Sequence, residues 1–445
     1  MKTIRLILIC LLTIAATAIR AQRIKTTIND TWRFAMQETS AASVDFDDAA
    51  WETISIPHTW NALDTDDETP GYARGKGWYR RRIKIDDLLP GQRVGIHFEG
   101  ANQVTVLYVN GHRVGNHTGG YTAFAFDITE YIHPGDNLFA IEVDNAHNPD
   151  IPPLSADYTF YGGIYRDVYL LYTPATHIST THYASQGVYV RTESVKNGHA
   201  QIAIRTMLSN PGLQAKRVQL QHRIADREGR IVARSTERLK LAANTENQPT
   251  EQRLEIDGVR LWDTEDPHLY KVYTQLTVDG QTDEVVSPLG VRTFSFDPDS
   301  GFTLNGRTVK LIGTNRHQDY LKMGNALPDE MHERDVELLA EMGGNFLRVS
   351  HYPQDPVVME MCDKKGIVTS VEIPIINAIT RSDAFRENCR RMALEMIWQN
   401  YNHPSTVVWA YMNEVLLWPP YDPTDTADKA DYFDWLLSIA RTLEE

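Results

Sequence analysis

The sequence is poor in cysteine, in basic clusters and in long apolar runs, and each shortage excludes a class of protein. It has three cysteines in 445 residues, and one of them, Cys10, lies in the N-terminal segment. The other two, Cys362 and Cys389, stand among apolar neighbours in helical patterns, which predicts buried thiols and excludes a disulfide scaffold. Lysine and arginine number 44 against 59 acidic residues and form no block, so no nucleic-acid-binding face is expected.

The N-terminal segment holds the one apolar run that stands out. Two basic residues precede an apolar stretch from Leu6 to about Ile14, and small residues follow up to Ala21. This order is typical of a secretory signal peptide, predicted over residues 1–21, and the run is short for the alternative of a membrane anchor. We therefore expect an exported bacterial protein, periplasmic or extracellular, with no membrane attachment after cleavage. The sequence leaves a homo-oligomer open.

Two blocks of short alternating strands follow, without helices between them. Residues 22–173 contain patterns such as the one at 103–109, which runs directly into an Asn-Gly pair at 110–111, a strong hairpin signal. This spacing predicts a β-sandwich whose tryptophans are mainly core residues rather than sugar-stacking platforms. Residues 174–295 predict a second, immunoglobulin-like sandwich that acts as a spacer, with a polar loop over 242–252.

After residue 296 the pattern changes to strands that alternate with helices. The predicted strands are 308–314, 345–350, 367–372 and 406–412, and the helices that follow them are 329–342, 355–365, 383–401 and 424–443. Four β-then-α units in succession predict a parallel sheet with helical crossovers. A complete eight-stranded barrel needs about 250 residues, so 296–445 is expected to form about the first half of one.

Each predicted parallel strand ends in polar residues of catalytic type. The four endings are Asn315-Arg316-His317, Ser350-His351, Glu372 and Asn413-Glu414. Because parallel strands bring their carboxyl ends to one face, we expect these residues to share one active-site cleft. No P-loop, dinucleotide fingerprint or serine nucleophile elbow accompanies them, and the two histidines lack the third ligand of a metal site.

Amides, imidazoles and an arginine around carboxylates suit a substrate with many hydroxyl groups, such as a sugar. Glu414 is the candidate general acid, provided that burial raises its pKa, and Asn413 is expected to hydrogen-bond the sugar. Glu372 has two interpretations, substrate contact or a hydrogen-bonded strand end, and the sequence does not separate them.

These motifs make the chain resemble glycoside hydrolase family 2, most closely its β-galactosidases. The matching motifs are GTNRH at 313–317, LRVSHYP at 347–353, WAYMNE at 409–414 and DYTFYGGIYRDV at 157–168. The resemblance covers the whole mature chain. It implies a jelly-roll sugar-binding domain over 22–173, the immunoglobulin-like domain over 174–295, and the first half of a TIM barrel. It also implies a retaining hydrolase of terminal β-D-galactosides.

The resemblance also assigns roles to single residues. They are Glu414 as acid/base, Asn413 as its substrate-binding neighbour, His317 and His351 in the galactose subsite, and Asp157 as a jelly-roll aspartate that reaches the sugar. Asn315 and Arg316 give the first motif its galactosidase-like form, whereas glucuronidases of the family tend to carry lysine there. All of these residues except Glu414, together with Glu372, are expected to bind the sugar.

Two features depart from the family pattern. Ile376 and Ala378 occupy the positions of magnesium ligands in some β-galactosidases, and neither offers an oxygen, so no metal or other cofactor is expected. No residue matches the family's nucleophile, and retaining hydrolysis needs two carboxyls. We therefore expect the 445-residue chain to be inactive alone. The alternatives are a non-catalytic carbohydrate-binding or scaffold protein and a β-glucuronidase-type member.

Overall fold

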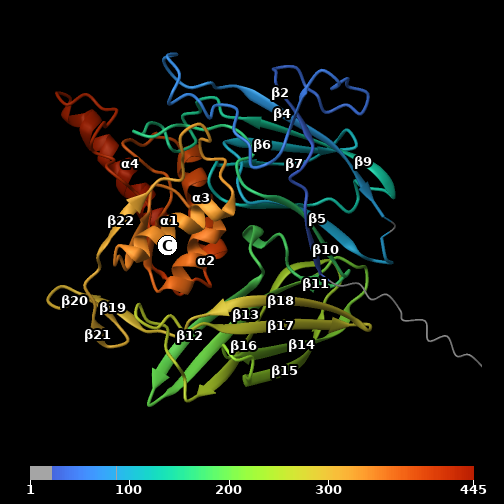
Figure 1. Cartoon of the computed structure of the whole chain (residues 1–445), viewed down its shortest axis with the longest axis vertical. Coiled ribbons are helices and arrows are strands. Elements are labelled where there is room, and N and C mark those ends of the chain that lie inside the picture. Colours follow the sequence, from blue (N-terminus) through green and yellow to red (C-terminus); the bar gives the residue numbers. More distant parts are fainter. Residues whose placement is uncertain (1–22, 87) are drawn as a thin grey trace, which may run out of the picture.

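The protein consists of two β-sandwiches and an α/β unit, shown together in Figure 1. The structure, a computed structural model, describes residues 23–86 and 88–445, so the predicted signal peptide lies outside the described residues. Hydrogen bonds connect each of the three parts with the other two. None of the helices in the described residues has the length and apolar character that a membrane crossing requires.

The first sandwich is built from two antiparallel sheets. One contains β1 (Ile24–Thr27), β10 (Val168–Thr173), β5 (Arg93–Phe98) and β8 (Phe124–Asp127); the other contains β3 (Glu52–Ile54), β2 (Trp32–Met36), β4 (Lys76–Ile85), β9 (Gly135–Asp144), β6 (Val104–Val109) and β7 (His112–Thr118). The predicted hairpin is confirmed, because β6 pairs with β7 across Asn110 and Gly111, whose φ angles of 52° and 83° suit a tight turn.

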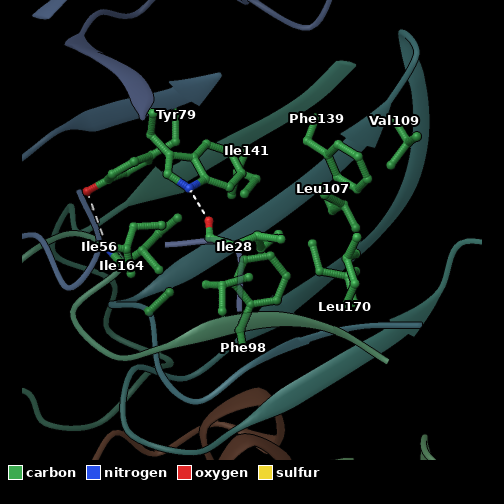
Figure 2. Close-up of a cluster of buried hydrophobic side chains, with 14 of the residues drawn as sticks. Ile28, Ile56, Tyr79, Phe98, Leu107, Val109, Phe139, Ile141, Ile164 and Leu170 are labelled. Carbon is green, nitrogen blue, oxygen red and sulfur yellow. Dashed lines mark hydrogen bonds between the residues drawn. The ribbon is translucent and has the colours of Figure 1, made fainter. Parts of the chain in front are cut away.

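The core of this sandwich is aromatic and aliphatic. Trp32 and Trp78 are both 0% exposed, which confirms the prediction that these tryptophans are core residues. The indole of Trp32 still finds a partner, because its Nε1 donates to the carbonyl of Ile28 at 2.6 Å. Figure 2 shows this bond beside Tyr79, whose hydroxyl accepts from the backbone of Ile164 at 3.2 Å. These two polar groups are thus satisfied within the apolar layer.

The second sandwich also has two sheets. One contains β11 (His177–Ile178), β13 (His199–Asn210), β12 (Val188–Lys196) and β16 (Thr245–Asp257); the other contains β15 (Ile231–Leu241), β14 (Lys216–Ala225), β17 (Tyr270–Val278) and β18 (Gln281–Leu289). The predicted loop over 242–252 is wrong from residue 245 onward, because β16 pairs with β13 along its length. The exposed face of β16 is polar, while its residues Leu254 and Ile256 reach the core. Pro249 is tolerated because β16 is an outer strand of the sheet.

The α/β unit begins after a small sheet of β19 (Phe294–Asp297), β20 (Gly301–Leu304) and β21 (Arg307–Thr308). Its parallel strands are β22 (Gly313–Arg316), β23 (Phe346–Val349), β24 (Val368–Glu372) and β25 (Thr406–Ala410), and its helices are α1 (Asp329–Glu341), α2 (Pro356–Lys365), α3 (Asp383–Asn400) and α4 (Thr426–Glu444). The alternation agrees with the prediction except at 308–312. There Val309 donates to the Phe302 carbonyl at 3.0 Å and so continues the small sheet.

Capping groups at the helix ends and packing of the apolar helix faces stabilise the α/β unit. Asp355 and Ser382 accept backbone N–H groups at the starts of α2 and α3, and Gly366 closes α2 with a φ of 73°. The apolar faces of the helices pack on Val349 and Val371 of the sheet, and Cys362 and Cys389 are both fully buried, as predicted. The polar strand ends are left at the other side of this core.

Candidate active site

The four parallel strands are paired in order, and the pairing brings their carboxyl ends to one edge. Arg316 lies opposite Val349, and Glu372 lies opposite Ala410. Beyond the last strand, the Asn413 backbone continues the ladder through its N–H to the Ile375 carbonyl at 2.9 Å. The shared edge that the sequence predicts is therefore present.

Arg348 on β23 connects three of the strand ends. Its Nε donates to Glu372 Oε1 at 2.7 Å, and its Nη2 donates to Glu372 Oε2 at 3.1 Å. The same Nη2 donates to Asn413 Oδ1 at 2.8 Å, and His351 Nδ1 lies 3.3 Å from Glu372 Oε2. The Glu372 side chain is 0% exposed, so Arg348 compensates its charge in place of water. This geometry favours the strand-end interpretation of Glu372.

The two predicted histidines lie beside one another, with rings 5.4 Å apart. His317 Nδ1 is 3.1 Å from the hydroxyl of Tyr352. Burial, followed by the nearby His351, lowers the pKa of His317 below its usual value. A neutral imidazole can both donate and accept hydrogen bonds, which suits the binding of sugar hydroxyls.

The first sandwich supplies a loop to this cluster. Tyr158 packs against His317 with ring centroids 4.9 Å apart, and burial raises its pKa well above the usual range. Asp157, the residue before it, is exposed, and its charge acts on His317. The loop is held in place because Arg166 donates to the Pro353 carbonyl at 2.7 Å. Asp157 therefore comes to the strand ends from another domain.

Glu414 stands at the open end of β25. Its side chain is exposed, so the burial that the sequence argument required is not provided by the described residues. Its backbone has a φ of 52°, a left-handed conformation that costs an L-residue roughly 1–2 kcal/mol. Such strained positions are concentrated at functional sites. The neighbouring Asn413 is fixed by Arg348, and so the direction in which the chain presents Glu414 is fixed as well.

Asn315 and Arg316 have different environments. Arg316 is 9% exposed and donates to Asp335 at 2.8 Å and to Gln354 at 2.6 Å, which ties β22 to α1 and to the loop before α2. Its guanidinium therefore lies away from the strand-end cluster. Asn315 is exposed and pairs in register with Arg348, so its position belongs to the face that carries Glu372.

Three residues of the cluster were not among the sequence candidates: Arg348, Tyr158 and Tyr352. Arg348 and Tyr352 stand in the LRVSHYP motif, and Tyr158 follows Asp157, so all three were within quoted motifs. Arg348 is the second-last residue of its strand, and its side chain is on the face of the sheet that carries Glu372. Side chains alternate between the two faces of a strand, and this alternation in the sequence could have identified Arg348 as a residue of the cluster.

The described residues contain no group of three or more His, Cys, Asp or Glu side chains that converge as a metal site. Ile376 and Ala378, at the positions compared with magnesium ligands, are 1% and 9% exposed.

Removal of the Arg348 side chain is expected to destabilise the α/β unit. Arg348→Ala leaves the buried Glu372 carboxylate without its cation, which should lower the free energy of unfolding by about 2–3 kcal/mol. Urea denaturation measures this loss. The matched control is Arg390→Ala, which removes an exposed ion pair with Glu387 and should change stability by less than about 0.5 kcal/mol. Equal effects in the two variants would contradict the central position of Arg348.

Three family models match the chain in series. The sugar binding domain of glycosyl hydrolases family 2 matches residues 22–174, the model described as glycosyl hydrolases family 2 matches 176–292, and the family's TIM barrel domain matches 298–444. The chain belongs to glycosyl hydrolase family 2. The order of the three domains is the one that the resemblance implied.

Individual relatives differ in their names. A β-glucuronidase from Bacteroides fragilis is 37% identical over 411 residues, covering 89% of this chain and 57% of that protein. A β-galactosidase from Thermoanaerobacter pseudethanolicus is 32% identical over 424 residues, covering 94% of this chain and 52% of that protein. The chain thus spans about half the length of the family members that it matches.

A solved structure is similar as well. A calcium binding mutant of Bacteroides uniformis β-glucuronidase 2 superposes with a TM-score of 0.88 at 39% identity, covering 95% of this chain and 51% of that one. Its two substitutions replace aspartates that stand 26 positions apart in that protein.

Proposed function

We propose that this family 2 chain provides the acid/base side of a retaining β-glycosidase site, with Glu414 as the general acid and base. The observation that supports this most is the connected cluster in which Arg348 holds both Glu372 and Asn413, directly before Glu414. His317, His351 and Asp157 lie around it as partners for sugar hydroxyls. A general acid in this place would protonate the leaving oxygen, and then activate water.

Retention requires a second carboxyl about 5–5.5 Å from the first. Glu372 is poorly suited to this role, because both of its oxygens are engaged by Arg348 and His351 and its side chain is 0% exposed. We propose that the nucleophile comes from outside these 445 residues, either in a longer product of the same gene or in a second polypeptide.

The first candidate substrate is a terminal β-D-galactoside. The groups around Glu414 that could meet a sugar are the Asn413 amide, the imidazoles of His317 and His351 and the exposed Asp157 carboxylate, and the nearby cation Arg348 is committed to Glu372 and Asn413. A neutral sugar fits these partners. The second candidate is a β-D-glucuronide, because the relatives at 37% and 39% identity are named β-glucuronidases.

An assay with nitrophenyl glycosides distinguishes the candidates. The complete gene product is tested with the β-D-galactoside, the β-D-glucuronide and the β-D-glucoside, and kcat/KM is expected to be at least about 100-fold higher for the galactoside than for the other two. A higher kcat/KM for the glucuronide would contradict the galactoside proposal and support the β-D-glucuronide as the substrate. The 445-residue chain tested alone is expected to show no turnover. Robust turnover by this chain alone would contradict the assignment of the nucleophile to another segment.

We also propose that the chain binds a calcium ion at Asp329 and Asp355. These two aspartates stand 26 positions apart, as do the two replaced in the calcium binding mutant of the Bacteroides uniformis enzyme. Asp355 is 5% exposed; its Oδ1 accepts the Val357 N–H at 3.0 Å, while Oδ2 is 4.0 Å from His332 Nε2, too far for a hydrogen bond. A carboxylate oxygen without a donor, on a side chain that is largely buried, fits a hard cation.

The start of α1 lies close to the start of α2, because His332 Nε2 is 4.0 Å from Asp355 Oδ2, and Asp329 begins the same turn of α1 as His332. Calcium accepts backbone carbonyls and waters beside carboxylates, so two aspartates can anchor it without a third side chain. Isothermal titration should show one calcium ion per chain, lost in Asp355→Asn. Unchanged binding in that variant would contradict the site.

A further inference from the structure

A cavity lies where the three domains meet, between β10, β18 and α2 (Figure 1). Its volume is about 1010 Å³, at the upper end of the range of roughly 300–1,000 Å³ that small-molecule sites occupy. Among the described residues, side chains of all three domains line it, whereas His317, His351 and Glu414 do not. The cavity is therefore separate from the candidate active site at the strand ends.

One wall of the cavity is the outer face of the sheet that contains β1, β10 and β5. Side chains of β5 alternate, so Ile96 and Phe98 fill the core of the sandwich and His97 points the other way. The ring of Tyr169, opposite His97 on β10, stacks on the imidazole with centroids 4.6 Å apart. Lys25 Nζ on β1 lies 3.8 Å from the centroid of the Tyr169 ring. This row of side chains crosses three strands, and each of its members lines the cavity.

Three polar side chains of this wall have hydrogen-bonding groups that the described residues leave unused. His97 is 8% exposed, and neither its ring nitrogens nor the Tyr169 hydroxyl bonds to another described group. Glu99, next to the end of β5, has a side chain that is 15% exposed, and its carboxyl approaches Lys25 at 3.5 Å without a closer donor among the described residues. Buried polar groups are normally paired. The wall therefore offers donors and acceptors to a molecule that enters the cavity.

The charge state of these groups favours an uncharged ligand. Burial, followed by the charge of Lys25, lowers the pKa of His97 to about 3, and burial raises the pKa of Glu99 to about 8. At neutral pH the imidazole is therefore uncharged and the carboxyl is protonated. Both groups then donate as well as accept hydrogen bonds, as does the Tyr169 hydroxyl. Sugar hydroxyls also donate and accept, so neighbouring hydroxyls of a sugar ring match this wall.

We propose that the cavity binds a short neutral oligosaccharide, with Tyr169, His97 and Glu99 as its hydrogen-bond partners. The volume exceeds the needs of a single sugar and suits a short chain of them. The apolar faces of the sugar rings pack on aromatic side chains from the other two domains, Tyr273 of the second sandwich and Trp398 of α3. The site holds a glycan without cutting it, and it does not depend on the hydrolysis proposed at the strand ends.

Isothermal titration of the 445-residue chain with trisaccharides tests the site. The neutral probes are β-1,4-galactotriose, cellotriose, β-1,4-xylotriose and β-1,4-mannotriose, and the acidic probe is trigalacturonic acid. At least one neutral trisaccharide is expected to bind at one site per chain with a Kd below about 1 mM, and trigalacturonic acid at least about 10-fold more weakly.

Two variants locate the binding. Tyr169→Phe removes the hydroxyl, and His97→Phe keeps a ring that can stack on Tyr169 but removes its nitrogens. Each is expected to weaken binding about 3- to 10-fold, because one hydrogen bond to the sugar is lost. The matched control is Tyr172→Phe, on the same strand but packed against the sandwich core, and its affinity should equal that of the wild type. Midpoints of thermal unfolding should stay the same in all three variants, since no group removed has a partner among the described residues.

The possible results are distinct. Wild-type affinity in both Tyr169→Phe and His97→Phe would mean that the sugar binds elsewhere, and would overturn the site. Tighter binding of trigalacturonic acid would overturn the assignment of a neutral ligand. No binding of any trisaccharide would mean that water alone fills the cavity. Turnover of nitrophenyl glycosides by the complete gene product is a separate measurement, so failure of the proposed hydrolysis would leave this test unaffected.

Discussion

Glu414→Gln is expected to lower kcat/KM of the complete gene product for an alkyl β-D-galactoside by about 10²–10⁴-fold. An alkoxide is a poor leaving group, so bond cleavage needs a proton from the enzyme. A glutamine amide occupies the same volume but cannot supply that proton. The loss should be much smaller for the first step with a nitrophenyl galactoside, because nitrophenolate leaves without protonation. Comparison of the two substrates therefore separates loss of acid catalysis from loss of binding.

The matched control for this variant is Glu444→Gln on α4. Glu444 accepts from Tyr411 Oη at 2.6 Å and is the last residue of α4, in the same α/β unit. Its replacement should change kcat/KM by less than about threefold. If Glu414→Gln hydrolysed the alkyl galactoside as fast as the wild type, another residue would have to be the acid.

His222→Gln is expected to make the protein less sensitive to acid. Burial lowers the pKa of His222 to about 4, and it lowers the pKa values of the half-buried His58 and the buried His97 in the first sandwich to about 4 and about 3. Unfolded histidine has a pKa near 6.5, so below this pH the unfolded chain binds more protons than the folded one. Folding stability therefore decreases as the pH falls from about 6.5 towards 4.

The size of the stability loss follows from the difference between the folded and unfolded pKa values of His222. One pKa unit corresponds to about 1.4 kcal/mol, so His222 should contribute about 2–3 kcal/mol of lost stability between pH 7 and pH 4.5. Glu99, whose pKa burial raises to about 8, works in the opposite direction over part of this range. For this reason the informative quantity is the difference in unfolding free energy between variant and wild type, measured at both pH values.

His199→Gln is the matched control, at an exposed position of the same sandwich. The stability of His222→Gln relative to the wild type should improve by about 2–3 kcal/mol on acidification, and that of His199→Gln should not show this gain. A constant difference between His222→Gln and the wild type at pH 7 and pH 4.5 would mean that His222 does not resist protonation in the folded state.

Sequence patterns predicted the regular parts of the fold well, because the local signals and the tertiary packing agree there. The Asn-Gly hairpin and the four helices of the α/β unit were placed within two residues of their observed ends. β16 was missed because an outer strand can be polar along one face, so its composition is that of a loop. The segment 308–312 was placed in the wrong sheet, since a hydrophobic pattern does not specify its partner strand.

The site was predictable as a set of strand ends, and its connections were not. Topology alone brings His317, His351 and Glu372 together, because parallel strands share an edge. Successive side chains of a strand point to opposite faces of the sheet, and this alternation decides which arginine faces the cluster. Arg348 faces Glu372, whereas Arg316, the arginine selected from the sequence, turns toward α1. Sequence reasoning had no basis for the calcium proposal, because neither Asp329 nor Asp355 stands in one of the matching motifs.

The central claim is that the strand ends form the sugar site and present Glu414 to the glycosidic bond. A crystal structure of the complete gene product with a bound, non-hydrolysable β-D-galactoside tests it directly. The account predicts the Glu414 carboxyl within about 2.6–3.2 Å of the glycosidic heteroatom, with sugar hydroxyls on Asn413, His317 and His351. A sugar bound elsewhere, with Glu414 still facing solvent, would contradict it.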